Sequence, residues 1–173
     1  NVSYSKDGKT ILRFHNNIKL IRSSIFFGKH SDGTDKEYYA APIEANGFEI
    51  SSKGSPPSPK LSMTIIPDDL PQKTSDRITY LKMAMRDLDD LVGSKVTRIR
   101  TFAKYINSSN FFDPNGDLIS NAAPPPKDFD PDSNAYFPPD IFYIDRKSAE
   151  GKNYLELELA SPFDTQDIKL PGR

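Results

Sequence analysis

Apolar residues occur along this chain mostly in short runs, and several runs alternate with polar residues at every second position. In residues 60–66, Leu61, Met63 and Ile65 share one side, and Ser62 and Thr64 share the other. A period of two is typical of a half-buried strand, most often in an antiparallel sheet. This pattern, with enrichment in β-branched and aromatic residues, predicts strands at 18–27, 37–41, 43–51, 60–66, 96–106, 141–146 and 154–159.

One stretch has helical spacing instead. Apolar residues at steps of three and four predict a helix from about residue 76 to 92, with Thr74 or Ser75 as its N-cap and Gly93 as its left-handed stop. The apolar stripe of this helix consists of Ile78, Leu81, Met85, Leu88 and Val92. It is expected to pack on the core, although a seam between subunits would have the same pattern. Six or seven strands and one helix predict a mostly antiparallel α+β domain.

Residues 107–140 have no apolar periodicity and hold seven of the fifteen prolines together with six aspartates. A loop longer than about 12–15 residues inside a domain is usually functional, disordered or a linker. Because strands resume after it, we interpret it as a surface excursion rather than a domain boundary. The length of 173 residues suits one domain with its own core, so 1–173 is predicted to be a single domain with a long Pro/Asp-rich loop at about 107–140.

Composition narrows the class of protein. Hydrophobic residues make up 36% and charged residues 27% of the chain, as expected for a folded domain. We expect no membrane segment, because no apolar stretch approaches about 20 residues, and no secretory signal is visible. The chain has no cysteine, which excludes disulfides, thiolate metal sites and a cysteine nucleophile.

Charge is unevenly distributed along the chain. Residues 1–60 contain nine Lys/Arg and six Asp/Glu (+3), residues 61–110 eight and six (+2), and residues 111–173 six and twelve (-6). Nucleic-acid binding by charge alone needs a much more basic chain. An acidic end facing a basic body suits packing between subunits, and a solvated acidic loop is the simpler alternative.

The strand predicted at 96–106 has a basic face, which consists of Arg98, Arg100 and Lys104. Glu156 and Glu158 form the polar face of the last strand, and we expect them opposite the two arginines across a sheet. Exposed cross-strand pairs contribute about 0.2–1 kcal/mol each, so they would set register more than stability. Single-stranded nucleic acid would need aromatic residues interleaved on the same exposed face, and the alternation places just one there.

Histidines give little support for catalysis. His15 and His30 belong to neither a His-x-x-x-His nor a Glu-x-x-His unit, so a zinc site is not indicated. The adjacency of His30, Ser31 and Asp32 is no evidence for a triad, because triads are assembled from distant segments. We predict a turn at this position from its Asp-Gly chemistry.

Two acidic stretches, 113–117 and 128–134, space carboxylates like the start of a calcium loop. An EF-hand needs Gly at its sixth position and Glu at its twelfth, where the second stretch has Ser133 and Pro139. We therefore expect an ordinary turn and a solvated loop, and predict no metal site.

Several short motifs follow one another in a fixed order. They are Phe26-Phe27, Gly47-Phe48-Glu49, Lys53-Gly54, Pro59-Lys60-Leu61, the helix end Asp90-Leu91-Val92-Gly93, the basic strand from 96 to 102 and the close Leu170-Pro171-Gly172-Arg173. In order and spacing they resemble the phage minor tail protein L family over roughly residues 25–173. The resemblance implies an antiparallel β-sandwich or barrel, like tail-tube domains, with one flanking helix.

The resemblance also implies a structural role and no enzymatic activity. Family members act in the tail tip, or baseplate, of long-tailed phages (siphoviruses), where they join the tail tube to the central hub and fibre. The implied partners are the tube, distal tail ring and hub or fibre proteins, with a homotrimer, assembly in the host cytoplasm and no contact with nucleic acid or membrane.

Family members continue after the Pro-Gly-Arg motif into a cysteine-rich domain that binds an iron–sulphur cluster. Since this chain has no cysteine, we expect no cofactor, metal or catalytic residue in this segment. The candidate interface residues are Arg98, Arg100, Lys104, Glu156, Glu158, Gly47, Glu49 and Gly54. The two glycines allow bends where a side chain would clash, and Glu49 is either a register charge or a partner for a basic neighbour.

An alternative from another class is a β-rich ligand- or carbohydrate-binding module. Such a site needs exposed aromatic residues in a concave patch. The candidates are Tyr38, Tyr39, Tyr136, Phe137 and Phe142. A hydrolase has little support, because the chain offers no convincing acid–base pair.

Overall fold

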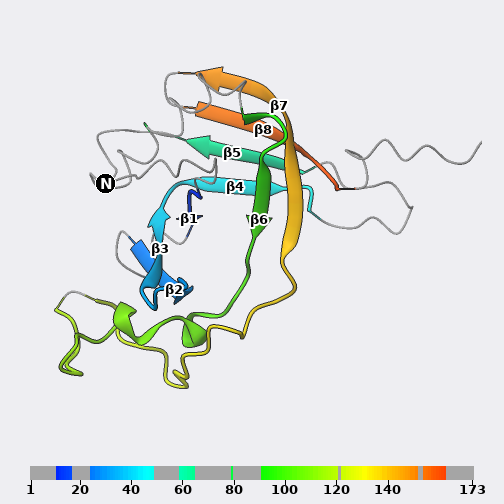
Figure 1. Cartoon of the computed structure of the whole chain (residues 1–173). Coiled ribbons are helices and arrows are strands. Elements are labelled where there is room, and N and C mark those ends of the chain that lie inside the picture. Colours follow the sequence, from blue (N-terminus) through cyan, green and yellow to red (C-terminus); the bar gives the residue numbers. More distant parts are fainter. Residues whose placement is uncertain are drawn as a thin grey trace, which may run out of the picture.

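The computed structural model describes residues 11–16, 24–48, 59–64, 79, 91–120, 122–151 and 154–162. Within these residues the chain forms two β-sheets (Figure 1). The three-stranded sheet has the order β1 (Phe14–His15), β3 (Asp35–Ala40) and β2 (Ser24–Lys29). The five-stranded sheet has the order β4 (Ile43–Asn46), β5 (Lys60–Thr64), β8 (Tyr154–Ala160), β7 (Asp140–Gly151) and β6 (Lys95–Arg98).

The pairing confirms a mostly antiparallel β fold. Every pair in the five-stranded sheet is antiparallel, as is β2 with β3, whereas β1 pairs with β3 in parallel. The five-stranded sheet has the form of a half-barrel. The helix predicted over 76–92 lies outside the described residues except at Thr79, Leu91 and Val92, of which Thr79 is helical. The flanking helix therefore stays a prediction, whereas its stop, Gly93, has the expected positive φ of 78°.

A turn at residues 30–34 joins β2 to β3, as its Asp-Gly chemistry predicts. The carboxylate of Asp32 accepts hydrogen bonds from the backbone N (2.9 Å) and Oγ1 (2.6 Å) of Thr34. Gly33 adopts a φ of 85°, which a side chain would disfavour. The backbone N of His30 donates to the carbonyl of Thr34 at 2.8 Å and closes the loop.

The core under the five-stranded sheet follows from the alternation of its strands. Leu61 pairs with Leu157, and Met63 pairs with Leu155, so apolar side chains meet on one face. The buried members of this core are Ala41, Met63, Phe142, Ile144, Leu155, Leu157 and Leu159. The opposite face has the charged residues of the same strands, as predicted.

The strand predicted at 96–106 is shorter than expected, because β6 ends at Arg98. Beyond it, the carbonyl of Arg100 accepts a hydrogen bond from the N of Phe137 (2.9 Å), and Oγ1 of Thr101 donates to the carbonyl of Ala135 (2.6 Å). These contacts with the far end of the long loop replace a continued ladder. The chain then forms two short 3-10 helices, η3 (Ala103–Tyr105) and η4 (Ser108–Asn110).

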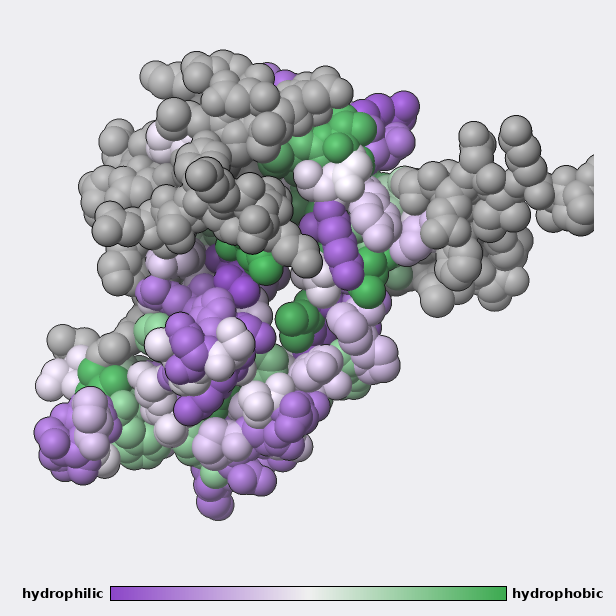
Figure 2. Space-filling view, viewed as in Figure 1, coloured by the Kyte–Doolittle hydropathy of each residue, from purple (hydrophilic) through white to green (hydrophobic). Residues whose placement is uncertain are grey.

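The long loop at 107–140 is not merely a surface excursion, which corrects the sequence-based interpretation. Phe111 is 2% exposed and packs with Phe27 and Ile106 in a second core. Phe129, from the middle of the loop, places its ring 5.0 Å from that of Phe111 and 6.1 Å from that of Phe112. The loop thus covers the β2–β3 hairpin, while its outer surface, at the bottom of the view in Figure 2, is mostly hydrophilic.

Two asparagine side chains attach this loop to β2. Oδ1 of Asn110 accepts from the N of Phe26 (2.8 Å), and its Nδ2 donates to the carbonyl of the same residue (2.7 Å). Asn107 makes the same pair of bonds with Gly28, at 3.0 and 3.3 Å. Each side-chain amide therefore takes the place that a neighbouring strand would occupy on the outer edge of β2.

Candidate functional site

The guanidinium groups of two arginines near the end of β6 lie over aromatic rings. Cζ of Arg98 is 4.6 Å from the ring centroid of Phe48, and Cζ of Arg100 is 5.5 Å from that of Phe137. A guanidinium within about 6 Å of a ring face gains about 0.5–1 kcal/mol at an exposed site. The ring of Phe48 packs edge-on against that of core residue Phe142, at 5.2 Å. The five-stranded sheet thus fixes the position of Arg98.

Exposed aromatic residues extend this surface. The ring of Phe102 lies 5.6 Å from that of Phe137, and the two residues are 57% and 47% exposed. Nζ of Lys104 is 4.9 Å from the ring centroid of Tyr105. We call Arg98, Arg100, Phe102, Lys104 and Phe137 the basic–aromatic surface. Large exposed aromatic side chains beside charged groups are common at binding sites.

The arginine end of the basic–aromatic surface has excess positive charge. Asp140 is the carboxylate that Arg98 and Arg100 share, at 3.8 Å (Nη1 to Oδ2) and 3.6 Å (Nε to Oδ2). Both distances exceed those of a hydrogen bond. Lys104 is instead matched by Asp128, at 3.0 Å, and this hydrogen bond raises the pKa of the lysine and lowers the pKa of the aspartate. Among the described residues, the positive charge without a close carboxylate therefore belongs to the two arginines.

The predicted position of the glutamates opposite these arginines is wrong. In the sheet β7 lies between β6 and β8, so Glu156 and Glu158 are not adjacent to β6. Instead Nζ of Lys60 lies 3.3 Å from Glu156 and 3.2 Å from Glu158, and Arg146 on β7 also pairs with Glu158. The sequence analysis thus identified the arginines of β6 and the glutamates of β8 as charged groups correctly, but it paired them with each other incorrectly.

Hydrogen bonds within the sheet hold these glutamates. The hydroxyl of Tyr154, Oγ of Ser148 (2.7 Å) and Nζ of Lys60 donate to Glu156 and lower its pKa to about 2. Hydrogen bonds from Lys60 first, and then from the β7 arginine, also lower the pKa of Glu158. Since these carboxylates are already matched on their own sheet, this face is a weaker candidate for binding a partner than the basic–aromatic surface.

Gly47 ends β4 with a φ of 77°, the bend that its residue type predicts. The next residue is Phe48, whose ring lies against Arg98. Gly47 therefore helps to position the ring on which Arg98 lies, and its contact with a partner stays a prediction. The other two residues of this prediction, Glu49 and Gly54, lie outside the described part of the chain.

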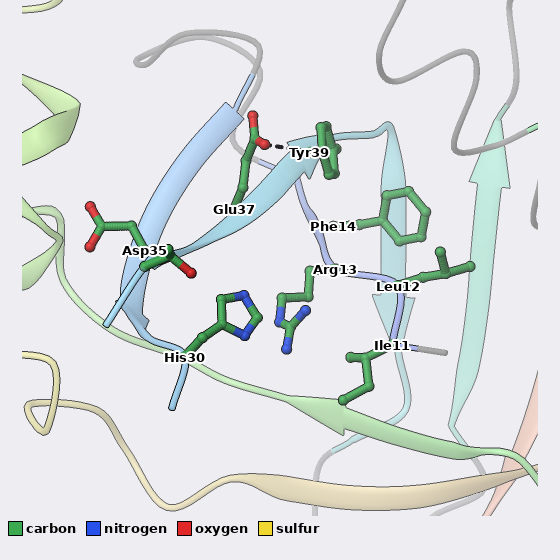
Figure 3. Close-up of a pocket in the computed structure, with 9 residues that line it drawn as sticks. Ile11, Leu12, Arg13, Phe14, His30, Asp35, Glu37 and Tyr39 are labelled. Carbon is green, nitrogen blue, oxygen red and sulfur yellow. Dashed lines mark hydrogen bonds between the residues drawn. The ribbon is translucent and has the colours of Figure 1, made fainter. Parts of the chain in front are cut away.

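A cavity of about 230 Å³ opens on the side of the three-stranded sheet (Figure 3). The side chains of Arg13 and His30 point toward one another in it. The hydroxyl of Tyr39 donates to Glu37 at 2.7 Å, and Asp35 accepts a hydrogen bond from Oγ of Ser109 outside the cavity. The lining residues are Ile11, Leu12, Arg13, Phe14, His30, Thr34, Asp35, Glu37 and Tyr39.

Neither this cavity nor the rest of the described chain forms a catalytic or metal-binding arrangement. The hydroxyl of Thr34 donates to Asp32, so it is not activated by His30. No group of three His, Asp or Glu among the described residues could hold a metal ion. With no cysteine in its 173 residues, the chain also lacks thiolate ligands for an iron–sulphur cluster. In the described part of the chain, no helix is long and apolar enough to cross a membrane.

The acidic stretches that resemble calcium loops form turns, as predicted. The backbone N groups of Asn115 (2.9 Å) and Asp117 (3.0 Å) donate to Oδ1 of Asp113. Oδ1 of Asp132 accepts from the N of Asn134 at 2.8 Å. These carboxylate oxygens stabilise the turns in which they lie.

The aromatic residues proposed for carbohydrate binding do not form one patch. Phe142 is 8% exposed in the main core, Tyr38 packs against the second core, and Tyr39 lines the cavity. Of the five candidates, Tyr136 and Phe137 are the well-exposed ones, at 45% and 47%. The structure therefore does not bring these five candidates together into the concave aromatic platform that such a module needs.

The sequence analysis identified Arg98 and Arg100 as candidate site residues but did not identify their partners. Phe137 and Asp140, at the far end of the long loop, contact these arginines, and no local sequence pattern indicates such a contact. Lys60 could have been predicted as a partner of the β8 glutamates, because the alternation of residues 60–66 places it on the same polar face as Ser62 and Thr64. The pairing of Arg146 could not be predicted, because the register of β7 is irregular, with bulges after Ile144 and Lys147.

The fold and these surfaces define a β-rich protein whose described residues present contact surfaces and no catalytic constellation. The family model described as "Phage minor tail protein L" matches residues 5–173, almost the whole chain. The chain therefore belongs to this family, which confirms the resemblance of the sequence motifs. It is a structural protein of the phage virion, located in the tail and in contact with other tail proteins.

Proposed function

We propose that this chain is a subunit of the tail tip, or baseplate, of a long-tailed phage of the siphovirus type. There it joins the tail tube to the central hub and fibre and is needed for tail assembly. The observation that carries the proposal is the family match over residues 5–173. Its partners would be the tube, distal tail ring and hub or fibre proteins, and we propose a homotrimer, which matches the implied symmetry of a tail tip.

The surface chemistry supports an assembly role. The basic–aromatic surface combines held guanidinium groups with exposed aromatic rings, the residue types enriched in protein–protein interfaces. Within the part of the chain that the structure describes, its charges are partly unmatched, whereas the glutamates of β8 are matched within the sheet. The proposal assigns no cofactor to these 173 residues and no catalytic step to any of them.

The test is assembly of tails in a phage from which the gene has been removed. The protein is supplied from a plasmid, and electron microscopy scores tube, tip and fibre on each particle. Without the protein we expect tubes or tail parts that lack a complete tip, and with it we expect infectious particles. Complete infectious tails in its absence would count decisively against the proposal.

A second experiment tests the position within the tail. A tagged copy that restores infectivity is located with gold-labelled antibody on intact virions. Label at the end of the tail distal to the capsid is expected, together with co-purification of the tagged copy with tube and hub proteins. Label distributed along the tube would contradict a role in the tip.

A further inference from the structure

We propose that copies of this chain pack head to tail, with the acidic segment Asp130-Pro131-Asp132 of one copy on the arginine end of the basic–aromatic surface of the next. The proposal rests on the proposed function, because it assigns residues to the contact between subunits of the proposed homotrimer.

The receiving surface is already ordered in the single chain. Arg98 and Arg100 are held on the rings of Phe48 and Phe137, so little side-chain freedom is lost when a carboxylate binds. Each guanidinium has five N–H donors, and Asp140 approaches them at 3.6 Å or more. Donors and positive charge therefore remain for a second carboxylate, which arginine binds well in a bidentate geometry.

The acidic segment is equally well ordered. The backbone N of Asp130 donates to the carbonyl of Lys104 at 2.9 Å, and that of Asp132 donates to the carbonyl of Tyr105 at 3.0 Å. All three residues of the segment, including Pro131, are exposed. Its two exposed aspartates flank Pro131 in the sequence, and they complement guanidinium groups beside the exposed rings of the basic–aromatic surface. Oδ1 of Asp132 already accepts from the N of Asn134 at 2.8 Å, so Asp130 is the carboxylate that the test changes.

The two surfaces do not satisfy each other within one copy. Among the described residues, the arginines pair with Asp140, and no salt bridge joins them to Asp130 or Asp132. A contact between two different surfaces of the same chain is heterologous, and it closes into a ring when the rotation between copies allows. The sequence has the matching asymmetry, since residues 1–110 sum to +5 and residues 111–173 to -6.

Charge reversal tests this contact in the purified full chain. The variants are Arg100→Glu, Asp130→Arg, the double variant with both changes, and Asp117→Arg as the control in another exposed part of the same loop. Analytical ultracentrifugation and native mass spectrometry measure the association constant and the number of copies. Circular dichroism checks folding, because Arg100→Glu brings a second carboxylate near Asp140, whereas Asp130→Arg does not.

We expect the wild-type chain to self-associate and each single reversal to weaken association by about tenfold or more, the effect of losing one close cross-interface charge pair. The double variant should recover association, because the reversed charges again attract, and Asp117→Arg should leave it unchanged. A monomeric wild type, or a double variant as weak as either single variant, would overturn the proposal.

Co-purification with tail proteins is measured on the same samples and separates the two hypotheses. A chain that stays monomeric but still binds a tail protein through Arg100 overturns the head-to-tail contact and leaves the proposed function standing. A chain that forms the expected ring but binds no tail protein supports the contact and argues against the proposed function.

Discussion

At the scale of single residues, the side chain of Asn110 forms hydrogen bonds with several buried backbone groups at once. It is 1% exposed, and its side-chain amide bonds to both backbone groups of Phe26 and to the carbonyl of Asn107, at 2.7–2.8 Å. A buried amide with all its hydrogen bonds formed is stable, whereas loss of one partner leaves the others without compensation. The attachment of a long loop to β2 thus depends on one short polar side chain.

Replacement of this residue should be costly. Asn110→Ala leaves the backbone N–H of Phe26 without its partner and removes one of the two hydrogen bonds that the carbonyl of Phe26 accepts, the other coming from the N of Asn107 at 3.1 Å. We expect a loss of about 1–3 kcal/mol in the free energy of unfolding. Urea denaturation measures the loss. Asn115→Ala, at an exposed turn of the same loop, is the matched control and should change stability by less than about 0.5 kcal/mol. Equal effects of the two changes would contradict this role for Asn110.

His15 gives the second prediction at this scale. Both of its ring nitrogens are buried without a hydrogen-bond partner among the described residues, and burial lowers its pKa below 6.5. The unfolded chain therefore binds the proton more readily, so the stability due to neutral His15 is present above about pH 6.5 and is lost as the pH falls below it. His15→Leu should flatten urea-measured stability between about pH 5 and 7. The control His30→Gln changes an exposed turn residue and should keep the slope.

At the scale of elements, ion pairs reinforce the alignment of β5, β8 and β7. Lys60 lies between Glu156 and Glu158, and Arg146 reaches Glu158 from the other side. A one-residue slip would turn these charges into the core and the leucines of β8 outward. The polar face therefore reinforces the register that the apolar face requires.

This arrangement predicts a defined response to acid. The pKa of Glu156 is about 2 in the folded chain against 4.5 as its ordinary value, so its stabilisation is complete above about pH 4.5 and lost as the pH falls toward 2. Glu156→Gln should make stability less dependent on pH in that window, as measured by thermal unfolding. Glu44→Gln, on the exposed face of β4, is the control. An unchanged pH dependence in Glu156→Gln would show that these hydrogen bonds do not persist in solution.

The sequence predicted the strands whose evidence is local. In β5 and β8 the side of each residue follows from its neighbours two positions away, so the faces were predicted correctly. The position of β7 between β6 and β8 depends on contacts across the whole chain, and the pairing of the glutamates was accordingly wrong. The end of β6 at Arg98 could not be predicted from the sequence either, because it depends on a hydrogen bond from Thr101 to the carbonyl of Ala135, 34 residues away.

At the scale of the whole molecule, the described residues form two cores of different origin. The first lies under the five-stranded sheet and follows from period-two patterns. The second joins the β2–β3 hairpin to an irregular loop through Phe27, Ile106 and Phe111, and the irregular spacing of its aromatic residues gave no signal. For the same reason the cations of the basic–aromatic surface were predictable and Phe137 was not.

Separate cores predict separate responses to mutation. Phe111→Ala removes a side chain that is 2% exposed, and we expect a loss of about 3–5 kcal/mol in the stability of the second core. Hydrogen exchange read by mass spectrometry should show faster exchange in residues 107–140 and in β2, with little change in β8. Leu157→Ala, in the first core, should show the reverse distribution. Uniformly faster exchange in both variants would mean that the two cores unfold as one unit.

The amides of Asn107 and Asn110 have a consequence for the period between synthesis and assembly. An edge strand with open backbone groups can pair with any other copy that it meets. On β2 the groups of Phe26 and Gly28 are already occupied by the chain's own side chains. Uncontrolled polymerisation through this edge is thereby blocked, and assembly is left to surfaces that recognise side chains.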